Sequence, residues 1–228
     1  MLKTIRLIIK RIIDIALSLF ILTIISPLLI LCAAAVFIES GRPIFYLQER
    51  IGKKGKPFVI YKFRTMIQNA EKKGLGYELV EGDERITKTG DFLRRWSIDE
   101  FPQLLNVLKG DMSLVGPRPT LGYQVEQYDS FQKRRLDMKP GMTGLATIRG
   151  RNLISWNERI EYDVWYIDNH SILLDFKIMW ETFSVIFKGS GIYAKTTEVF
   201  KIKPSGKNTS SQGEPNNFTA DNKSGQED

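Results

Sequence analysis

The chain has 228 residues, a formal net charge of +7 and a pI of about 9.4. It can therefore hold one domain with a core, and it should favour anionic partners such as nucleic acid, anionic lipid or a phosphorylated substrate. Its single cysteine, Cys32, excludes an intrachain disulfide and a cysteine-based zinc site. Its single histidine, His170, leaves a Ser-His-Asp triad open, but no nucleophile motif accompanies it, so catalysis is expected to rest on carboxylates and basic groups.

The first predicted element is an uncharged run of 24 residues, 15–38. As a helix it would be about 36 Å long, enough to span a bilayer, so an ordinary transmembrane helix is the simplest interpretation. Ser26-Pro27 lies in its middle, however. Proline removes a backbone donor and predicts a kink, and a neighbouring serine can satisfy the freed backbone group.

Basic residues flank this run on both sides. Four precede it: Lys3, Arg6, Lys10 and Arg11. Between residues 42 and 64 there are seven basic residues and one acid. A spanning helix should have asymmetric flanks, because lysine and arginine favour the cytoplasmic side. We therefore predict a re-entrant broken helix over 12–38 with both ends cytoplasmic, and Asp14 at headgroup depth paired with Arg11 or Arg6.

The remaining elements follow from pattern and turn residues. Residues 42–66 predict two short strands around a glycine-lysine turn, and 68–90 a loop with a short helix. Helices are predicted at 91–109, 123–137, 155–169 and 172–188, with loops at 110–122 and 139–152. The apolar stripe of the last helix suits either the core or, with Trp180 near basic residues, a membrane interface. The polar tail from residue 203 is expected to be disordered.

Two adjacent acids, Asp99 and Glu100, open the stretch "DEFPQLLNVLKGDMSLVGPRP". The apolar positions that follow one helical stripe are Ile98, Phe101, Leu104, Leu105 and Leu108. Asp99 would point nearly opposite this stripe, and Glu100 would lie near its edge. Adjacent helical residues do not face each other, so the acids could approach one phosphate from two directions but not form a stacked dyad.

Helix capping is the competing interpretation of this pair. Ser97-x-x-Glu100 matches a capping box, and Asp99 as N-cap would put Pro102 in the first turn. Capping does not exclude chemistry, because a helix N-terminus also suits a phosphate.

Arginines surround the acids in sequence and in the following loops. Arg94 and Arg95 precede them, Arg118 stands between two prolines that restrict its backbone, and Arg149 and Arg151 straddle a glycine. Because a guanidinium matches a phosphate bidentately, this set suggests a phosphate-bearing substrate and a divalent metal.

Together the motifs resemble the small monotopic phosphoglycosyl transferases, the bacterial sugar transferase family. The resemblance covers about residues 5–190 and rests on the Ser-Pro-broken apolar helix and on five motifs: "YKFRTM", "DEFPQLLNVLKGDMSLVGPRP", "KPGMTGL", "GRNLISWNERIEYDVWYI" and "LLDFKIM". It implies an α+β, mostly helical, monotopic membrane protein with an N-terminal re-entrant broken helix, a short β-hairpin and amphipathic interfacial helices. The implied segments are a membrane hairpin at 1–40, a catalytic domain at 41–200 and a disordered tail at 201–228.

The resemblance also implies an activity. Members transfer a phospho-sugar from a UDP-sugar to polyprenyl (undecaprenyl) phosphate, releasing UMP, at the cytoplasmic face of the bacterial inner membrane. By motif, Asp99 matches the nucleophile, Glu100 the acid that binds Mg²⁺, and Asp175 a further active-site acid. The matching substrate-anion positions are Arg94, Arg118 and Arg151. A covalent aspartyl intermediate would give ping-pong kinetics.

Three other functions fit parts of this pattern. A non-catalytic membrane scaffold would use Asp99 and Glu100 as caps only. A single-displacement glycosyltransferase usually carries Asp-x-Asp, which is absent here. A nucleic-acid binder would show basic and aromatic residues on one face, whereas the positive charge here clusters beside the apolar run, as anionic membrane lipids would require. The sugar, the pathway and the oligomeric state stay open, a homodimer included.

Overall fold

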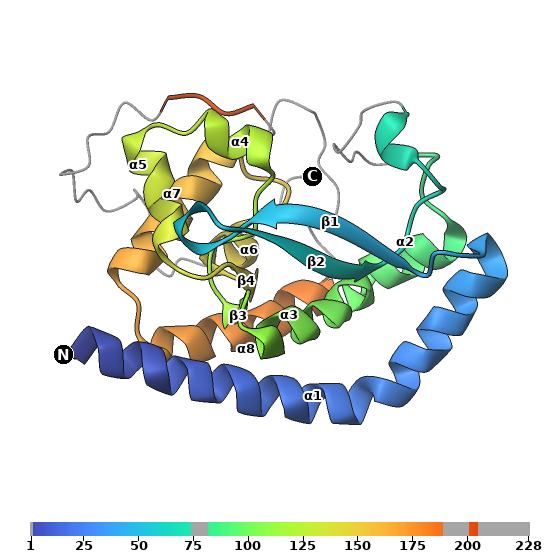
Figure 1. Cartoon of the computed structure of the whole chain (residues 1–228), viewed down its shortest axis with the longest axis horizontal. Helices are drawn as coiled ribbons and strands as arrows, with labels where there is room; N and C mark the ends of the chain where they lie inside the picture. The colour runs from blue at the N-terminus through green and yellow to red at the C-terminus, as the bar shows by residue number, and fades with distance from the viewer. Residues whose placement is uncertain (1, 74–81, 189–200, 205–228) are drawn as a thin grey trace, which may run out of the picture.

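A computed structural model describes residues 2–73, 82–188 and 201–204 of the chain (Figure 1). The fold is mostly helical α+β, as predicted. Its longer helices are α1 (Leu2–Ser40), α2 (Lys88–Arg95), α3 (Leu104–Lys109), α7 (Trp156–Asp168) and α8 (Ile172–Lys188). Shorter α-helices are α4 (Gly122–Glu126), α5 (Ser130–Lys133) and α6 (Leu145–Arg149). The predicted disorder of the tail falls, apart from residues 201–204, outside the described residues.

Helix α1 is one continuous helix with Pro27 inside it, and Figure 1 shows that it curves around the rest of the chain. Pro27 has no N–H for the carbonyl of Thr23, four residues earlier. The Ser26 hydroxyl donates to that carbonyl instead, at 2.9 Å. The predicted break is therefore a bend in an unbroken helix. In the part of the chain that the structure describes, Thr4–Ser40 is the one helix long and apolar enough to cross a membrane.

The first half of α1 is attached to the domain by charged side chains. Lys10 Nζ lies 2.8 Å from Asp175 of α8, and Arg11 donates to the carbonyl of Leu108 in α3 at 2.8 Å. Asp14 is buried and accepts hydrogen bonds from the Ser113 hydroxyl at 2.8 Å and from a backbone N–H at 3.0 Å. The predicted partners of Asp14, Arg11 or Arg6, were therefore wrong: a neighbouring strand satisfies this carboxylate.

The end of α1 is attached to the same domain. The Glu39 carboxylate accepts from the backbone N–H groups of Lys88 and Thr89 at 2.8 Å each, at the start of α2. These N–H groups have no partner within their own helix, and a negative charge is favourable there. Arg64 adds a hydrogen bond to the carbonyl of Gly41 at 2.8 Å. Both ends of α1 therefore contact the same folded domain.

The predicted hairpin is confirmed. Strands β1 (Phe45–Ile51) and β2 (Pro57–Phe63) pair antiparallel around the short 3-10 helix η1 (Lys53–Gly55). Asn106 of α3 holds strand β2 of the hairpin. Its Nδ2 donates to the Val59 carbonyl at 2.7 Å, and its Oδ1 accepts from the Tyr61 N–H at 3.1 Å.

Two predicted loops contain regular structure instead. Strands β3 (Ser113–Val115) and β4 (Gly141–Thr143) form a parallel pair, and α6 follows directly. The chains approach so closely that a Cβ on Gly141 would lie 2.1 Å from the Gly116 nitrogen, and one on Gly144 2.3 Å from the Gly116 oxygen. Glycine is needed there because any side chain would collide with backbone. The glycines on which the loop prediction rested therefore lie where two distant backbone segments contact each other.

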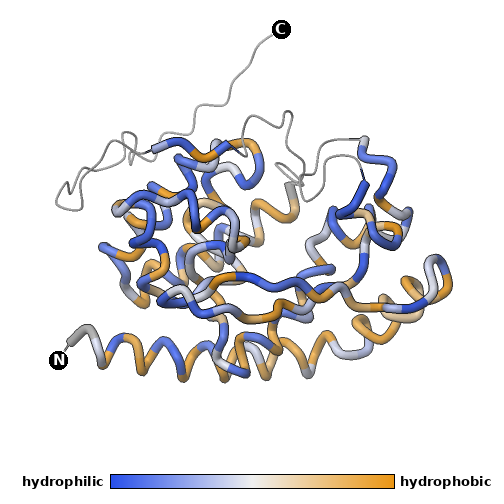
Figure 2. The backbone as a smooth tube through the Cα atoms, turned by 45° about the horizontal axis from the view of Figure 1, so that its top comes forward, coloured by the Kyte–Doolittle hydropathy of each residue, from blue (hydrophilic) through white to orange (hydrophobic). Residues whose placement is uncertain are grey.

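Two predicted helices are subdivided. The 91–109 helix is α2, then the 3-10 helix η3 (Ile98–Gln103), then α3. The 123–137 helix is α4, α5 and the 3-10 helix η4 (Arg134–Asp137). The stripe on α8 is not core: Phe176, Trp180 and Phe183 are exposed, whereas Ile178 is buried. Figure 2 shows the concentration of apolar residues along α1.

Candidate active site

The acidic pair lies in η3 and not at a cap. Ser97, between α2 and η3, has a left-handed backbone with φ 56°, and its side chain makes no capping hydrogen bond. Asp99 and Glu100 both lie inside the 3-10 helix, as does Pro102. Both predicted capping arrangements were therefore wrong. Since Pro102 cannot donate a backbone hydrogen bond, a regular α-helix through this segment is disfavoured, and the tighter turn presents the acids differently.

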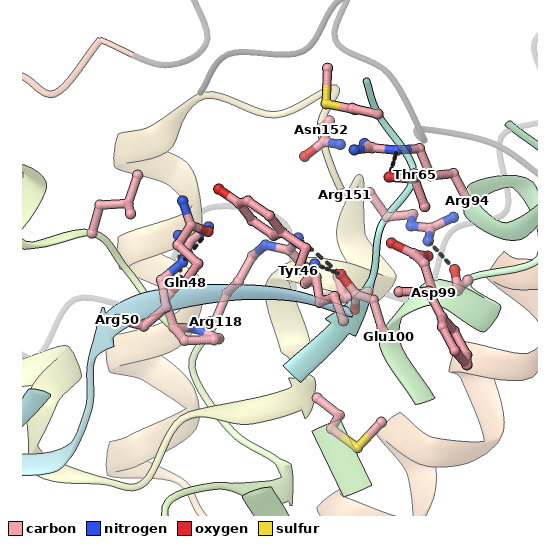
Figure 3. Close-up of a pocket in the computed structure, with 18 of the residues that line it drawn as sticks. Tyr46, Gln48, Arg50, Thr65, Arg94, Asp99, Glu100, Arg118, Arg151 and Asn152 are labelled. Carbon is pink, nitrogen blue, oxygen red and sulfur yellow. Dashed lines mark hydrogen bonds and ion pairs between the residues drawn. The ribbon is translucent and has the colours of Figure 1, made fainter. Parts of the chain in front are cut away.

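The pair lines a cavity of about 650 Å³ (Figure 3). The hairpin, η3, the Pro-Arg-Pro loop and the region around α6 and α7 enclose it. Five of the six predicted site residues line it: Arg94, Asp99, Glu100, Arg118 and Arg151. Residues from segments more than 100 positions apart in the chain thus meet around one space large enough for a substrate.

Glu100 is held as a charged carboxylate. Its Oε1 lies 2.5 Å from Lys62 Nζ and 3.4 Å from Arg118 Nη2. Burial alone would raise its pKa, but the charges of Lys62 and Arg118 outweigh burial and hold the pKa well below its usual range. Both ion pairs use the same oxygen, and within the described residues Oε2 is left available.

Asp99 has a different environment from its neighbour. It is 7% exposed, and burial raises its pKa above the ordinary value even though the charge of Lys62 opposes the shift. Among the described residues it makes no ion pair. A carboxyl group at the wall of a cavity, near cations whose charge favours its ionised form, suits a nucleophile.

Two arginines reach the cavity beside Asp99. Arg94 Nε donates to Thr65 Oγ1 at 2.7 Å. Helix α2 can come this close because Gly90 lies against Thr65, where a Cβ would be 2.0 Å from the Thr65 oxygen. Arg151 donates to Ser97 Oγ at 2.7 Å. Each guanidinium is therefore oriented by a hydrogen bond to a neighbouring hydroxyl at the edge of the cavity.

Arg118 is positioned through its backbone by a residue that sequence reasoning missed. Arg135 is fully buried and donates to the Arg118 carbonyl at 3.2 Å and to the Tyr128 hydroxyl at 2.6 Å. It also pairs with Asp163 and lies against the Trp156 ring, 5.2 Å from its centroid. This buried arginine fixes the Pro-Arg-Pro loop, and nothing in the sequence distinguished it from the surface cations around it.

Asp175 is not among the residues that line the cavity with Asp99 and Glu100. It accepts hydrogen bonds from Lys10 Nζ at 2.8 Å and from the Tyr166 hydroxyl at 2.5 Å, and His170 Nε2 lies 3.3 Å away. Burial alone would raise its pKa, but the hydrogen bonds from His170 and Lys10 outweigh it and lower the pKa. The geometry makes Asp175 an anchor for α1, and it gives no support to the expected catalytic role of Asp175.

Lys62 was also missed as a site residue. It lies in the quoted motif "YKFRTM", but the sequence did not indicate that β2 crosses beside η3. Burial lowers its pKa, and the charge of Glu100 opposes that shift. It is the cation nearest Glu100 in the described chain.

The chain is similar to known proteins over most of its length. The model of the family described as "Bacterial sugar transferase" matches residues 5–189. The chain belongs to this family. An uncharacterized sugar transferase of Bacillus subtilis, EpsL, is 47% identical over 186 residues, covering 82% of this chain and 91% of that protein. The family match contains all five sequence motifs and most of the residues that the structure describes.

Two larger relatives are named for their substrates. The undecaprenyl-phosphate galactose phosphotransferase of Salmonella typhimurium is 40% identical over 198 residues, and the UDP-glucose:undecaprenyl-phosphate glucose-1-phosphate transferase of Klebsiella pneumoniae is 43% identical over 198. These matches cover 81% and 82% of this chain but 41% of each relative. The chain thus corresponds to less than half the length of these two enzymes.

Magnesium was predicted at Glu100. The described residues contain no group of three or more His, Cys, Asp and Glu that could hold a metal ion alone. Mg²⁺ commonly uses only one or two carboxylates, with substrate phosphates and water completing six ligands. Ionised Glu100, whose two ion pairs both use Oε1, fits an ion that binds together with a phosphorylated substrate.

Proposed function

We propose that this chain transfers a phospho-sugar from a UDP-sugar to undecaprenyl phosphate and releases UMP, through a covalent intermediate on Asp99. The arrangement that carries the proposal is the cavity in which Asp99 and Glu100 face four cations: Lys62, Arg94, Arg118 and Arg151. Phosphoryl transfer depends on positioning the substrate phosphates and neutralising their charge, and the basic residues around the acidic pair can do both. The names of the related enzymes agree with these substrates.

The reaction has two displacements. In the first, an Asp99 carboxylate oxygen attacks the sugar-bearing phosphorus, the bond to the bridging oxygen breaks, and its electron pair leaves with UMP. In the second, a phosphate oxygen of the lipid attacks the same phosphorus, and Asp99 departs as a carboxylate. Lys62 and Arg118 neutralise charge beside Glu100, and Arg94 and Arg151 do so beside Asp99. When bound at Glu100, Mg²⁺ would supply further charge stabilisation.

The membrane arrangement is a second part of the proposal. Lys10 near one end of α1 and Glu39 at the other both bind the catalytic domain, so both ends are held on the same side. With its bend at Pro27, α1 enters the bilayer from the cytoplasmic face and returns to it. The exposed stripe on α8, with Trp180, is placed at the interface.

The test is UMP release across a panel of UDP-sugars with undecaprenyl phosphate. The related enzymes are named for galactose and for glucose, so the panel includes both. One donor should give acceptor-dependent UMP release that requires Mg²⁺. A scaffold protein would release none with any donor, and its main support, capping by Asp99 and Glu100, does not occur in the structure.

A further inference from the structure

Strand β1 presents three polar side chains to the cavity. Tyr46, Gln48 and Arg50 line it and are partly buried, whereas Phe45, Leu47 and Glu49 are exposed, Phe45 and Leu47 at the border of the same cavity. This alternation is the two-residue period of a strand, and it puts the three side chains on one face. No sequence motif indicates a role for these three residues.

Arg50 is fixed before any ligand arrives. Its Nε and Nη2 donate to Gln48 Oε1 at 3.0 and 2.5 Å, and its Nη1 donates to the Pro119 carbonyl at 3.4 Å. Burial, followed by the charge of Arg118, lowers the pKa of Arg50 to about 10. An anion bound between Arg50 and Arg118 would offset both the lost solvation of Arg50 and the repulsion between the two arginines.

The charged groups follow an order across the cavity. Figure 3 shows Asp99, Glu100 and Arg118 in succession, with Arg50 beyond Arg118. Arg94 and Arg151 lie on the other side, toward Asp99. The cations thus lie in two groups in this view, Arg118 with Arg50 and Arg94 with Arg151, and the parts of the cavity beside these groups are called its two arms.

The geometry of in-line displacement indicates which part of the UDP-sugar each arm would bind. The attacking and leaving oxygens lie on opposite sides of the phosphorus. With Asp99 attacking, the leaving phosphate must lie on the side away from Asp99, which is the arm of Arg118 and Arg50. The nucleoside then lies along the β1 face, where Figure 3 places Tyr46 between Arg50 and Glu100 and where Tyr123 also lines the cavity.

We propose that Arg50, oriented by Gln48, binds the phosphate that leaves with UMP, and that Tyr46 and Tyr123 frame the uridine. This assignment rests on the proposed function. It makes the β1 face the nucleotide subsite, so sugar recognition and lipid entry belong to the arm that contains Arg94 and Arg151.

The experiment measures UMP binding to the full-length protein by calorimetry, together with KM for the UDP-sugar. Arg50→Lys should weaken UMP binding roughly tenfold and raise KM by a similar factor, because the charge stays but the fork is lost. Gln48→Leu should act in the same direction, more weakly, since it frees Arg50 without removing it. Glu49→Gln, on the exposed face of the same strand, is the matched control and should change neither value.

Melting temperatures of all variants establish that each is folded. Unchanged UMP binding in folded Arg50→Lys, or altered preference among UDP-sugars at constant UMP affinity, would overturn the assignment. If the wild-type protein released no UMP from any donor, the proposed function would fail separately. Direct UMP binding would still decide whether the β1 face is a nucleotide site.

Discussion

At the scale of single residues, two adjacent acids differ because their neighbours differ. Glu100 is paired with Lys62 and Arg118 through one oxygen, whereas Asp99 is buried without an ion pair among the described residues. The first environment favours a permanent charge that a cation can use, and the second favours a group that reacts. The proposed roles therefore follow from the surroundings of each carboxyl group.

Substitutions of Glu100 and of Arg118 should reduce activity in different ways. Glu100→Gln keeps the shape but removes the charge that a hard cation requires, so it should need much more Mg²⁺ and lose most of kcat. Arg118→Lys keeps the charge but loses the bidentate fork, so its loss should appear in kcat/KM for the UDP-sugar at an unchanged Mg²⁺ midpoint. Metal titration of both variants separates them. Equal shifts of the midpoint, or no shift in either, would mean that the roles are wrongly assigned.

Asp175→Asn tests whether this acid is an anchor or a catalyst. The change leaves buried Lys10 without its countercharge, so it should reduce the free energy of unfolding by about 3 kcal/mol at neutral pH. Because the folded-state pKa of Asp175 is lowered, its contribution is present above its unfolded pKa of about 4 and is lost as pH falls through the folded value.

Denaturant unfolding of wild type and Asp175→Asn across pH checks this. The difference in stability should be constant near neutrality and shrink below about pH 4. Activity at a temperature where the variant is folded should stay near wild type. Loss of turnover at unchanged stability would return Asp175 to the catalytic residues.

The residues that sequence reasoning found are those that carry unusual local patterns. Adjacent acids and an arginine between prolines stand out in one dimension, and the structure brings them together. Lys62, Arg50 and Arg135 act only because distant segments cross beside them, so local pattern could not reveal them. Asp175 was assigned by motif alone, and its position depends on where α1 packs.

At the scale of elements, periodicity predicted the hairpin, α7 and α8, and failed where backbone contacts decide. The helix predicted over 91–109 is broken at Ser97 and Pro102, which turn the acids into the cavity. The predicted loops at 110–122 and 139–152 pair as parallel strands through Gly116 and Gly141, whose contact is between distant segments. A sequence pattern within either segment does not contain that contact.

The bend of α1 predicts its response to Pro27→Ala. The restored N–H can bond the Thr23 carbonyl and release Ser26, so the helix should straighten, and some molecules should span the bilayer. The measurement is cysteine labelling in intact cells, in a Cys32→Ser background, with probes at Lys3 and at Lys53 in the hairpin turn. In the otherwise unchanged chain both probes should react only after permeabilisation. Labelling of the Lys3 probe from outside in that chain would exclude re-entrance.

At the scale of the whole molecule, the acidic pair is connected to helix α1 on both sides. Segment η3 stands between α2, which Glu39 binds, and α3, which Arg11 binds. Both contacts come from α1, near its two ends. In the proposed arrangement the reacting carboxyl group is thereby held at a fixed depth relative to the bilayer, which suits an acceptor whose phosphate stays at the membrane surface.

The central proposal is a covalent phospho-sugar on Asp99, and intact-protein mass spectrometry tests it most directly. Wild-type protein given Mg²⁺ and its UDP-sugar without lipid acceptor should gain the mass of one phospho-sugar on Asp99 and release one equivalent of UMP. Folded Asp99→Asn should show no adduct and no turnover, with little change in melting temperature, because burial already disfavours the charged form of Asp99. Turnover by Asp99→Asn near the wild-type rate, or an adduct on another residue, would contradict the double-displacement mechanism.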